Sequence, residues 1–114
     1  MRLIELDISW NHLLSNSIDS IMSELDANRT LRYLNISWNQ IVGKNMATNK
    51  NIVTKFSNFI IGNHNLLHLD LCSINLQGDS LKKVGKMISM SPSIIGFHLC
   101  GNPITEKNMK YLRK

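Results

Sequence analysis

Four segments of the chain share one arrangement of apolar and polar positions. Each has the form apolar-x-x-apolar-x-apolar-x-x-Asn-x-apolar, and the third departs from it because Ile74 takes the asparagine position. Apolar and polar residues alternate at the centre of each segment, which predicts a short strand with one face toward a core. The segments begin at Leu3, Leu31, Leu66 and Ile94, so their starts lie 28, 35 and 28 residues apart.

After each strand segment the apolar residues recur at helical spacing, which predicts that a helix follows every strand. The first helix is expected to start at Asn16 or Ser17, because both residue types cap helices well. The second is expected after Asn51 and before Gly62, and the seven extra residues of this unit predict a polar loop over residues 43–51. The apolar stripes are Ile18, Ile21, Met22 and Leu25, then Ile52, Phe56, Phe59 and Ile60, then Leu81, Val84, Met87 and Ile88.

The last two helices have weaker boundary signals. The third is expected to start at Asp79 or Ser80 and to end before Pro92, because a proline disfavours helical backbone in the residue that precedes it. A short fourth helix is expected from Thr105, with Met109 and Leu112 on its apolar face.

The strand pattern resembles the leucine-rich repeat family, and the 28-residue spacing resembles its long-repeat class, typified by ribonuclease inhibitor. The resemblance implies an α/β fold of about four repeats: a solenoid with a curved parallel sheet on the concave side and helices on the convex side. A single domain is expected over residues 1–114, either as a whole or as a segment of a longer array.

The asparagine position has a structural meaning in this family, because its side chains form a ladder that satisfies backbone groups where the chain leaves each strand. Asn11, Asn39 and Asn102 match that position in this sequence. Ile74 does not, so we expect a broken ladder and a local irregularity in the third repeat.

The two ends of the array bear on how the chain is used, since repeat arrays need polar caps over their first and last units. No polar capping helix precedes Leu3. Two interpretations follow. The chain is part of a longer solenoid or larger assembly, or it is a small self-sufficient domain whose edges are covered by oligomerisation.

Composition narrows the class of protein. A hydrophobic fraction of 43% and a charged fraction of 18% in 114 residues favour one folded domain. No run approaches the ~20 apolar residues that span a bilayer, and the periodic, acid-containing N-terminus is unlike a signal peptide. Two cysteines are too few for a disulfide scaffold, so we expect an intracellular, cytoplasmic protein, with cytoskeletal or ciliary association as an alternative.

Residues between the apolar template positions should point to the concave face. They form a polar surface with an aromatic corner, where both tryptophans of the chain occupy the same register on adjacent repeats. Large aromatic residues in such a patch are typical binding anchors, although both rings could instead pack on the connecting loops. The candidate partner-binding residues are Glu5, Asp7, Trp10, Tyr33, Asn35, Trp38, His68, Asp70 and His98.

A second cluster on this face consists of Asp70, Cys72, His98 and Cys100, all of which are competent zinc ligands. The chain lacks the short C-x-x-C spacing of many zinc sites, so metal binding is a minor alternative and no cofactor is expected. A disulfide between the two cysteines is also not expected, because adjacent parallel strands do not usually present suitable geometry.

Charge is unevenly distributed, with a net charge of +5 and five of the eight acids within residues 1–30. Lysines gather on the expected third and fourth helices, which indicates a solvated helical face or, as an alternative, contact with an acidic partner. They are Lys82, Lys83 and Lys86, then Lys107, Lys110, Arg113 and Lys114.

The hypothesis is therefore a non-catalytic protein–protein interaction module that binds a protein partner, with a basic patch, through its concave face. One alternative is a structural subunit of a large cytoskeletal or ciliary assembly. Another is a binder of an acidic polymer through the lysine-rich helices, although no nucleic-acid motif accompanies the lysines. No arrangement of nucleophile, base and acid suggests an enzyme, and no membrane partner is expected.

Overall fold

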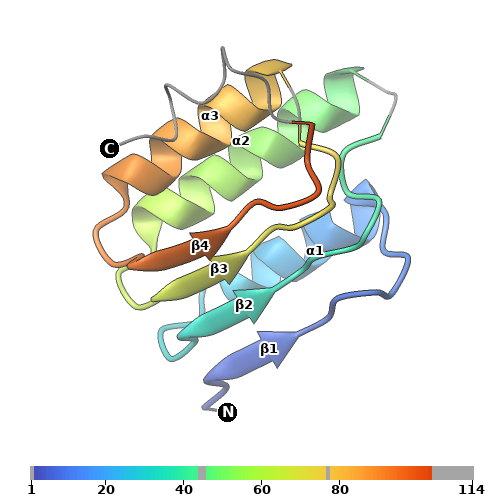
Figure 1. The fold of residues 1–114 in the computed structure, drawn as a ribbon. Coiled ribbons are helices and arrows are strands. Elements are labelled where there is room, and N and C mark those ends of the chain that lie inside the picture. Colours follow the sequence, from blue (N-terminus) through green and yellow to red (C-terminus); the bar gives the residue numbers. More distant parts are fainter. Residues whose placement is uncertain (1, 44–45, 77, 104–114) are drawn as a thin grey trace.

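Strands and helices alternate along the chain. The computed structural model describes residues 2–43, 46–76 and 78–103. The four strands form one parallel sheet in the order β1-β2-β3-β4, and the three helices cover one face of it (Figure 1). The described part of the chain is thus an α/β fold. The elements are β1 (Glu5–Asp7), α1 (Ser15–Leu25), β2 (Tyr33–Asn35), α2 (Met46–Gly62), β3 (His68–Asp70), α3 (Gly78–Met90) and β4 (Gly96–His98).

The register of the sheet confirms the columns that the sequence predicts. Leu6, Leu34, Leu69 and Phe97 are aligned across the four strands. Leu34 and Leu69 belong to the apolar core and Leu6 packs against it, whereas Phe97 is partly exposed. The positions before and after this column point away from the helices, because side chains alternate along a strand. We call this second surface the open face; its residues are Glu5, Asp7, Tyr33, Asn35, His68, Asp70, Gly96 and His98.

The core lies between the sheet and the helices. Side chains from all three helices and from the strand segments belong to one continuous apolar cluster. Ile18 of α1, Ile60 of α2 and Leu81 of α3 are fully buried in it, which confirms the apolar stripes expected for the three helices. Because each helix buries one face against the sheet, the open face is left for solvent or a partner.

Two helix starts differ from the prediction. α1 begins at Ser15 after Leu14, which makes no side-chain cap, so the expected start at Asn16 or Ser17 is wrong. α2 begins at Met46, so the expected start at Asn51 is wrong and residues 46–51 are helical instead of a loop. The side-chain amide of Asn49 accepts a hydrogen bond of 2.8 Å from the Gly43 N–H and donates one of 2.6 Å to the Gly43 C=O. These two bonds connect the first part of α2 to the backbone that precedes it and so stabilise the earlier start of the helix.

The helix ends follow the sequence signals. α2 ends at Gly62 and α3 ends at Met90, before the Ser91-Pro92 pair, as expected. α3 starts at Gly78, one residue before the expected Asp79. The fourth helix, expected from Thr105, lies outside the described residues. Among the helices that are described, none has the length and apolar character to cross a membrane.

Candidate functional site

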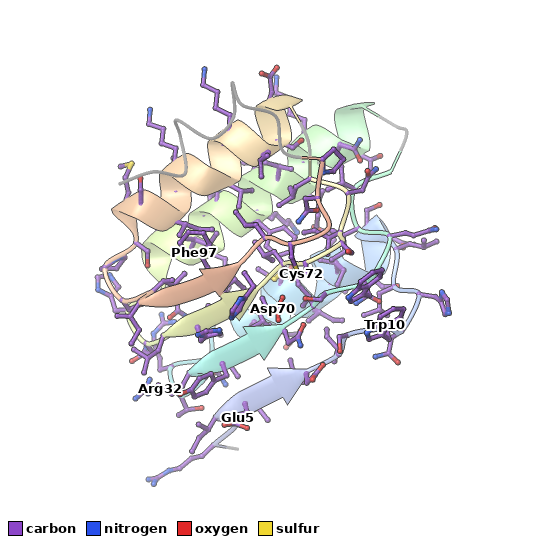
Figure 2. All side chains as sticks on the ribbon, viewed as in Figure 1. Glu5, Trp10, Arg32, Asp70, Cys72 and Phe97 are labelled. Carbon is purple, nitrogen blue, oxygen red and sulfur yellow. A yellow bond between two sulfur atoms is a disulfide. The ribbon has the colours of Figure 1, made fainter. Side chains whose placement is uncertain are left out.

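The open face contains a shallow hollow of about 220 Å³ over the first three strands. Its floor is the backbone and side-chain surface of β1, β2 and β3, and its walls are polar side chains from neighbouring repeats. Figure 2 shows Glu5 at the start of β1 and Asp70 on β3, on the side of the sheet away from the helices. Six predicted partner-binding residues therefore line one hollow: Glu5, Asp7, Tyr33, Asn35, His68 and Asp70.

Two aspartates at equivalent positions are held by short local bonds. Asp7 Oδ1 accepts hydrogen bonds from the backbone N–H of Ser9, at 3.0 Å, and from the Ser9 hydroxyl. These bonds to the charged form, the hydroxyl first, lower the pKa of the exposed Asp7 carboxyl below its ordinary value. The Asp7 carboxylate is thus both ionised and oriented.

Asp70 is fixed across repeats as well as locally. Its Oδ1 accepts a hydrogen bond from the hydroxyl of Ser37, on the neighbouring repeat, and one from the backbone N–H of Cys72 at 3.2 Å. Ser37 is itself buried. This contact was missed at the sequence level, although the predicted register places Ser37 and Asp70 on neighbouring repeats, where they could have been paired.

An aromatic row crosses the middle of the open face. The His68 ring lies 5.9 Å from the Tyr33 ring and 4.8 Å from the His98 ring, measured between centroids. The His68 imidazole occupies the space above Gly96, where an added Cβ would come within 2.6 Å of Nδ1. The missing side chain at Gly96 therefore lets His68 lie against the next strand and reach His98.

The two tryptophans form the aromatic corner. Their rings are stacked, with centroids 4.2 Å apart and planes 10° from parallel. Trp10 is 64% exposed and Trp38 is 47% exposed, so the rings pack on each other and leave much of their surface open to solvent. Figure 2 places Trp10 beyond the carboxyl end of β1, at the opposite end of that strand from Glu5.

The backbone at this corner is left-handed. Trp10 and Trp38 have φ values of 60° and 59°, and Ser73 and Gly101 at the same register have φ values of 52° and 71°. Bulky residues rarely adopt such angles. Hydrogen bonds from Trp10 N to Ser37 O and from Trp38 N to Cys72 O continue the pairing of the strands and hold the conformation. The apolar template did not predict this left-handed backbone.

The ladder asparagines make repeated backbone contacts. The Asn39 oxygen accepts the N–H groups of Asn11 and Leu13, and its amide nitrogen donates to carbonyls that include that of Ile8. Asn102 makes the equivalent bonds with the third repeat, accepting from Ile74 and Leu76. Both amides are buried. Because each forms hydrogen bonds with the preceding repeat, each joins two repeats.

The outer and irregular members of this series differ. Asn11 is exposed and donates to the carbonyls of Ile8 and Ser9 within its own repeat. Ile74 is buried in the core, and the neighbouring Asn75, with a φ of 69°, donates to the carbonyl of Val42 instead. In the third repeat, Asn75 thus takes over from the residue at the ladder position and donates a hydrogen bond to a backbone carbonyl of the second repeat.

Cys72 and Cys100 are joined by a disulfide, so the expectation that they would not pair is wrong. Each cysteine lies two residues after the last residue of its strand, Cys72 after β3 and Cys100 after β4. Their Cα atoms are 4.6 Å apart, within the range that a disulfide needs. The close spacing of parallel strands brings the equivalent positions together. Disulfides persist mainly in oxidising environments, so the cysteine count no longer supports a reducing compartment.

The disulfide also bears on the minor metal alternative. Sulfur atoms bonded to each other are not thiolate ligands, which leaves Asp70 and His98 of the four candidate residues. Over the part of the chain that the structure describes, no group of three or more histidine, cysteine, aspartate or glutamate side chains is placed to hold a metal ion.

The lysines of the third helix lie on the opposite side of the molecule from the open face. Lys82, Lys83 and Lys86 are exposed on α3, and Lys83 donates a hydrogen bond of 2.9 Å to the hydroxyl of Thr54 on α2. The cations expected on the fourth helix, from Lys107 onward, lie outside the described residues. The acidic and basic surfaces are therefore separated by the core.

Comparison with known families agrees with the repeat pattern. Residues 2–25 match a family model described as Leucine Rich Repeat, and residues 27–44 match a second one described as Leucine Rich repeat. These ranges correspond to the first two repeats, and the matches support a leucine-rich repeat family and a repeat protein. Such repeats generally mediate protein–protein interaction, and neither match indicates a catalytic family. A comparison with curated proteins gives no significant match.

Proposed function

We propose that this chain is a non-catalytic interaction module that binds a protein partner through the open face of its sheet. In this proposal residues 1–114 form one domain, and the open face is the concave side of a curved solenoid of the ribonuclease-inhibitor-like class. Support for that class comes from the full helix that follows each of the first three strands and from the 28-residue spacing. The observation that carries the proposal is the exposed Trp10–Trp38 stack beside a polar hollow.

The stack and the hollow are suited to recognition because they are already ordered. Hydrogen bonds hold the Asp7 and Asp70 carboxylates, and the two indole rings restrict each other. A surface that is rigid before binding loses less conformational entropy on association. Exposed tryptophans are also the residue type most enriched among binding hot spots. The proposed contact residues are Glu5, Asp7, Trp10, Tyr33, Asn35, Trp38, His68, Asp70 and His98.

The charge of the open face indicates the character of the partner. Its described strand positions include Glu5, Asp7 and Asp70 and contain no lysine or arginine, although the whole chain carries a net charge of +5. A local excess of negative charge favours a partner with a basic patch and raises its association rate. This asymmetry supports a protein partner approaching the sheet and not the lysine-bearing helices.

The test combines capture with a purified interaction. Proteins that the wild-type chain captures from its native cell extract are identified by mass spectrometry, expressed, and titrated calorimetrically with the wild type and with Trp10→Ala/Trp38→Ala. We expect the double variant to bind at least about 30-fold more weakly, the effect of losing a hot spot. Lys50→Ala/Lys86→Ala, on exposed positions of α2 and α3, is the matched control and should bind as the wild type does. Equal affinity of the tryptophan variant would contradict the proposal.

A second candidate function is a structural subunit of a larger assembly. It is favoured by large apolar side chains exposed beside both outer strands, Ile4 and Leu14 near β1 and Ile95 and Phe97 near β4. Exposed apolar patches often mark interfaces. Sedimentation velocity of the full chain over a hundredfold concentration range tests it: association that Ile4→Ser and Ile95→Ser weaken would support it, and a monomer throughout would count against it.

A further inference from the structure

We propose that the Trp10–Trp38 stack receives an arginine side chain of the partner, with the guanidinium plane lying on the exposed indole face of Trp10. This inference rests on the proposed function and specifies the chemistry of its partner. The exposed carboxylate of Asp7, the last residue of β1, supplies negative charge that draws the cation to the end of the strand that Trp10 follows.

The first argument is the geometry of the two rings. They lie nearly parallel with centroids 4.2 Å apart, so the stack presents a flat face. Among the described residues, the Trp38 ring stacks on Trp10, and Trp10 remains the more exposed of the two at 64%. The Trp10 face away from Trp38 is therefore the surface available to a ligand.

The second argument is that the stack is fixed before any ligand arrives. Both tryptophans hold a left-handed backbone that a bulky side chain seldom adopts, with φ values near 60°. Backbone bonds of 3.1 Å to Ser37 O and 2.9 Å to Cys72 O hold the two residues in that conformation. Left-handed backbone at non-glycine residues carries a cost and persists only where the surrounding structure holds it. Here it directs two indoles to the surface in the same orientation.

The third argument is complementarity of charge. An indole face attracts a cation through its quadrupole, most strongly when the cation is partly desolvated. Asp7 is three residues before Trp10, is exposed, and has its carboxylate oriented by Ser9. A lysine could use the same field, but guanidinium is planar and more weakly hydrated, so it stacks on a ring while its N–H groups still reach a carboxylate. The flat stack and the adjacent acid together favour arginine.

The experiment uses the two tryptophans as reporters, because they are the only ones in the chain. Three peptides of equal length are titrated at one fixed ionic strength: alternating glycine–arginine, alternating glycine–lysine, and alternating glycine–citrulline. We expect saturable quenching of the tryptophan fluorescence by the arginine peptide, with an affinity about five-fold or more above that of the lysine peptide. Citrulline keeps the planar shape without the charge and should not bind measurably.

Variants separate the indole face from the charge. Trp10→Leu keeps an apolar side chain and leaves Trp38 as the reporter, and it should abolish the preference for arginine over lysine. Trp10→Phe retains a ring and should keep part of the preference, which guards against a trivial loss of folding. Asp7→Asn should weaken the arginine and lysine peptides by the same factor. Lys50→Ala is the matched control and should change neither affinity.

The outcomes distinguish this inference from the proposed function. Equal affinity for the arginine and lysine peptides, an unchanged preference in Trp10→Leu, or no binding of either peptide would each overturn the arginine inference. The proposed function is tested with the captured protein partner, whose affinity can depend on the open face without any arginine on the stack. The proposed function would be overturned if the tryptophan double variant bound that partner as tightly as the wild type does. The peptide result alone would not overturn it.

Discussion

Asp7 and Asp70 occupy equivalent positions on two strands, yet their carboxylates are held in different ways. Asp7 is bound within its own turn by Ser9, whereas Asp70 also receives the Ser37 hydroxyl from the neighbouring repeat. The consequence is that Asp70 joins two repeats and Asp7 keeps more of its surface for a partner. The contact with Ser37 therefore gives Asp70 a structural role between repeats, in addition to the binding role proposed for both aspartates.

The pKa of Asp7 provides a residue-scale prediction. In Ser9→Ala the carboxylate loses the hydroxyl bond and keeps the backbone one, so its pKa should rise part of the way to its ordinary value. Because the folded-state pKa is depressed, the stabilising contribution is present above the unfolded-state pKa and is lost as the pH falls through the folded value. NMR titration of the Asp7 carboxyl carbon measures the shift. Ser20→Ala on α1 is the control, and an unchanged pKa in Ser9→Ala would contradict the assignment.

The buried amide of Asn39 provides a second residue-scale prediction. Asn39→Ala would leave the partly buried N–H groups of Asn11 and Leu13 without their acceptor, and such donors are costly when they lack a partner. We expect the free energy of unfolding to fall by about 2–4 kcal/mol, measured by urea denaturation. Asn11→Ala, at the exposed ladder position, should cost less than about 1 kcal/mol. Similar losses in the two variants would show that the amide is not a bridge between repeats.

At the scale of the elements, the disulfide is the one covalent link between repeats. Cys72 and Cys100 follow β3 and β4, and they are 28 positions apart in the sequence, with all of α3 between them. Closing a loop of this length restricts the unfolded chain, and the chain-entropy model gives a stabilisation of about 3–4 kcal/mol. The link therefore secures the last two strands to each other.

The prediction is that reduction destabilises the protein by about 3 kcal/mol without unfolding it. Urea denaturation of the wild type with and without dithiothreitol measures the difference. Cys72→Ser/Cys100→Ser should match the reduced wild type and should not respond to dithiothreitol. A wild-type midpoint that is the same in both conditions would show that the link contributes nothing to stability.

The strands and helices also show how much of the fold could be predicted from the sequence alone. The apolar template predicted all four strands and their register, because every slip by one residue would move polar side chains such as Asp70 into the core. The ends of α2 and α3 were readable from Gly62 and Pro92. The start of α2 was not, because it depends on the contact between Asn49 and Gly43. That contact is between two polar groups and leaves no trace in an apolar pattern.

The candidate site was predictable to the same degree. Register placed six residues around one hollow and the two tryptophans on adjacent repeats. It did not reveal the stacking of the rings, the left-handed backbone or the Ser37–Asp70 bond, since each depends on side-chain orientation. The sequence placed Cys72 and Cys100 in one column. Because adjacent parallel strands do not usually present suitable disulfide geometry, the two were predicted not to pair. The Cα spacing of 4.6 Å in the structure contradicts that prediction.

Over the described part of the molecule, the core separates an acidic patch on the sheet from a basic patch on α3. The open face carries three carboxylates, and the exposed face of α3 carries three lysines. One continuous core lies between them and includes side chains from every helix. A basic partner is therefore attracted to the sheet and repelled from α3, which favours one orientation of docking. Low ionic strength should strengthen this preference, because exposed charges are screened over about 10 Å at 0.1 M salt.

The continuity of the core leads to a prediction for the whole chain. α2 packs against both α1 and α3, so the loss of any one repeat would expose apolar surface on the next. In repeat proteins such coupling between neighbours makes unfolding cooperative. Fluorescence of Trp10 and Trp38 reports on the first two repeats, whereas far-UV circular dichroism reports on all the helices. We expect their urea transitions to coincide, as for a two-state domain.

The same comparison with Cys72→Ser/Cys100→Ser locates the weakest part of the array. Without the disulfide, the pairing of β3 with β4 depends on backbone bonds and on side chains that include the partly exposed Phe97. If the shared core dominates, both transitions shift together to lower urea. If the circular dichroism transition of the variant begins at lower urea than the fluorescence transition, the last repeat unfolds separately, and the core is less cooperative than its continuity implies.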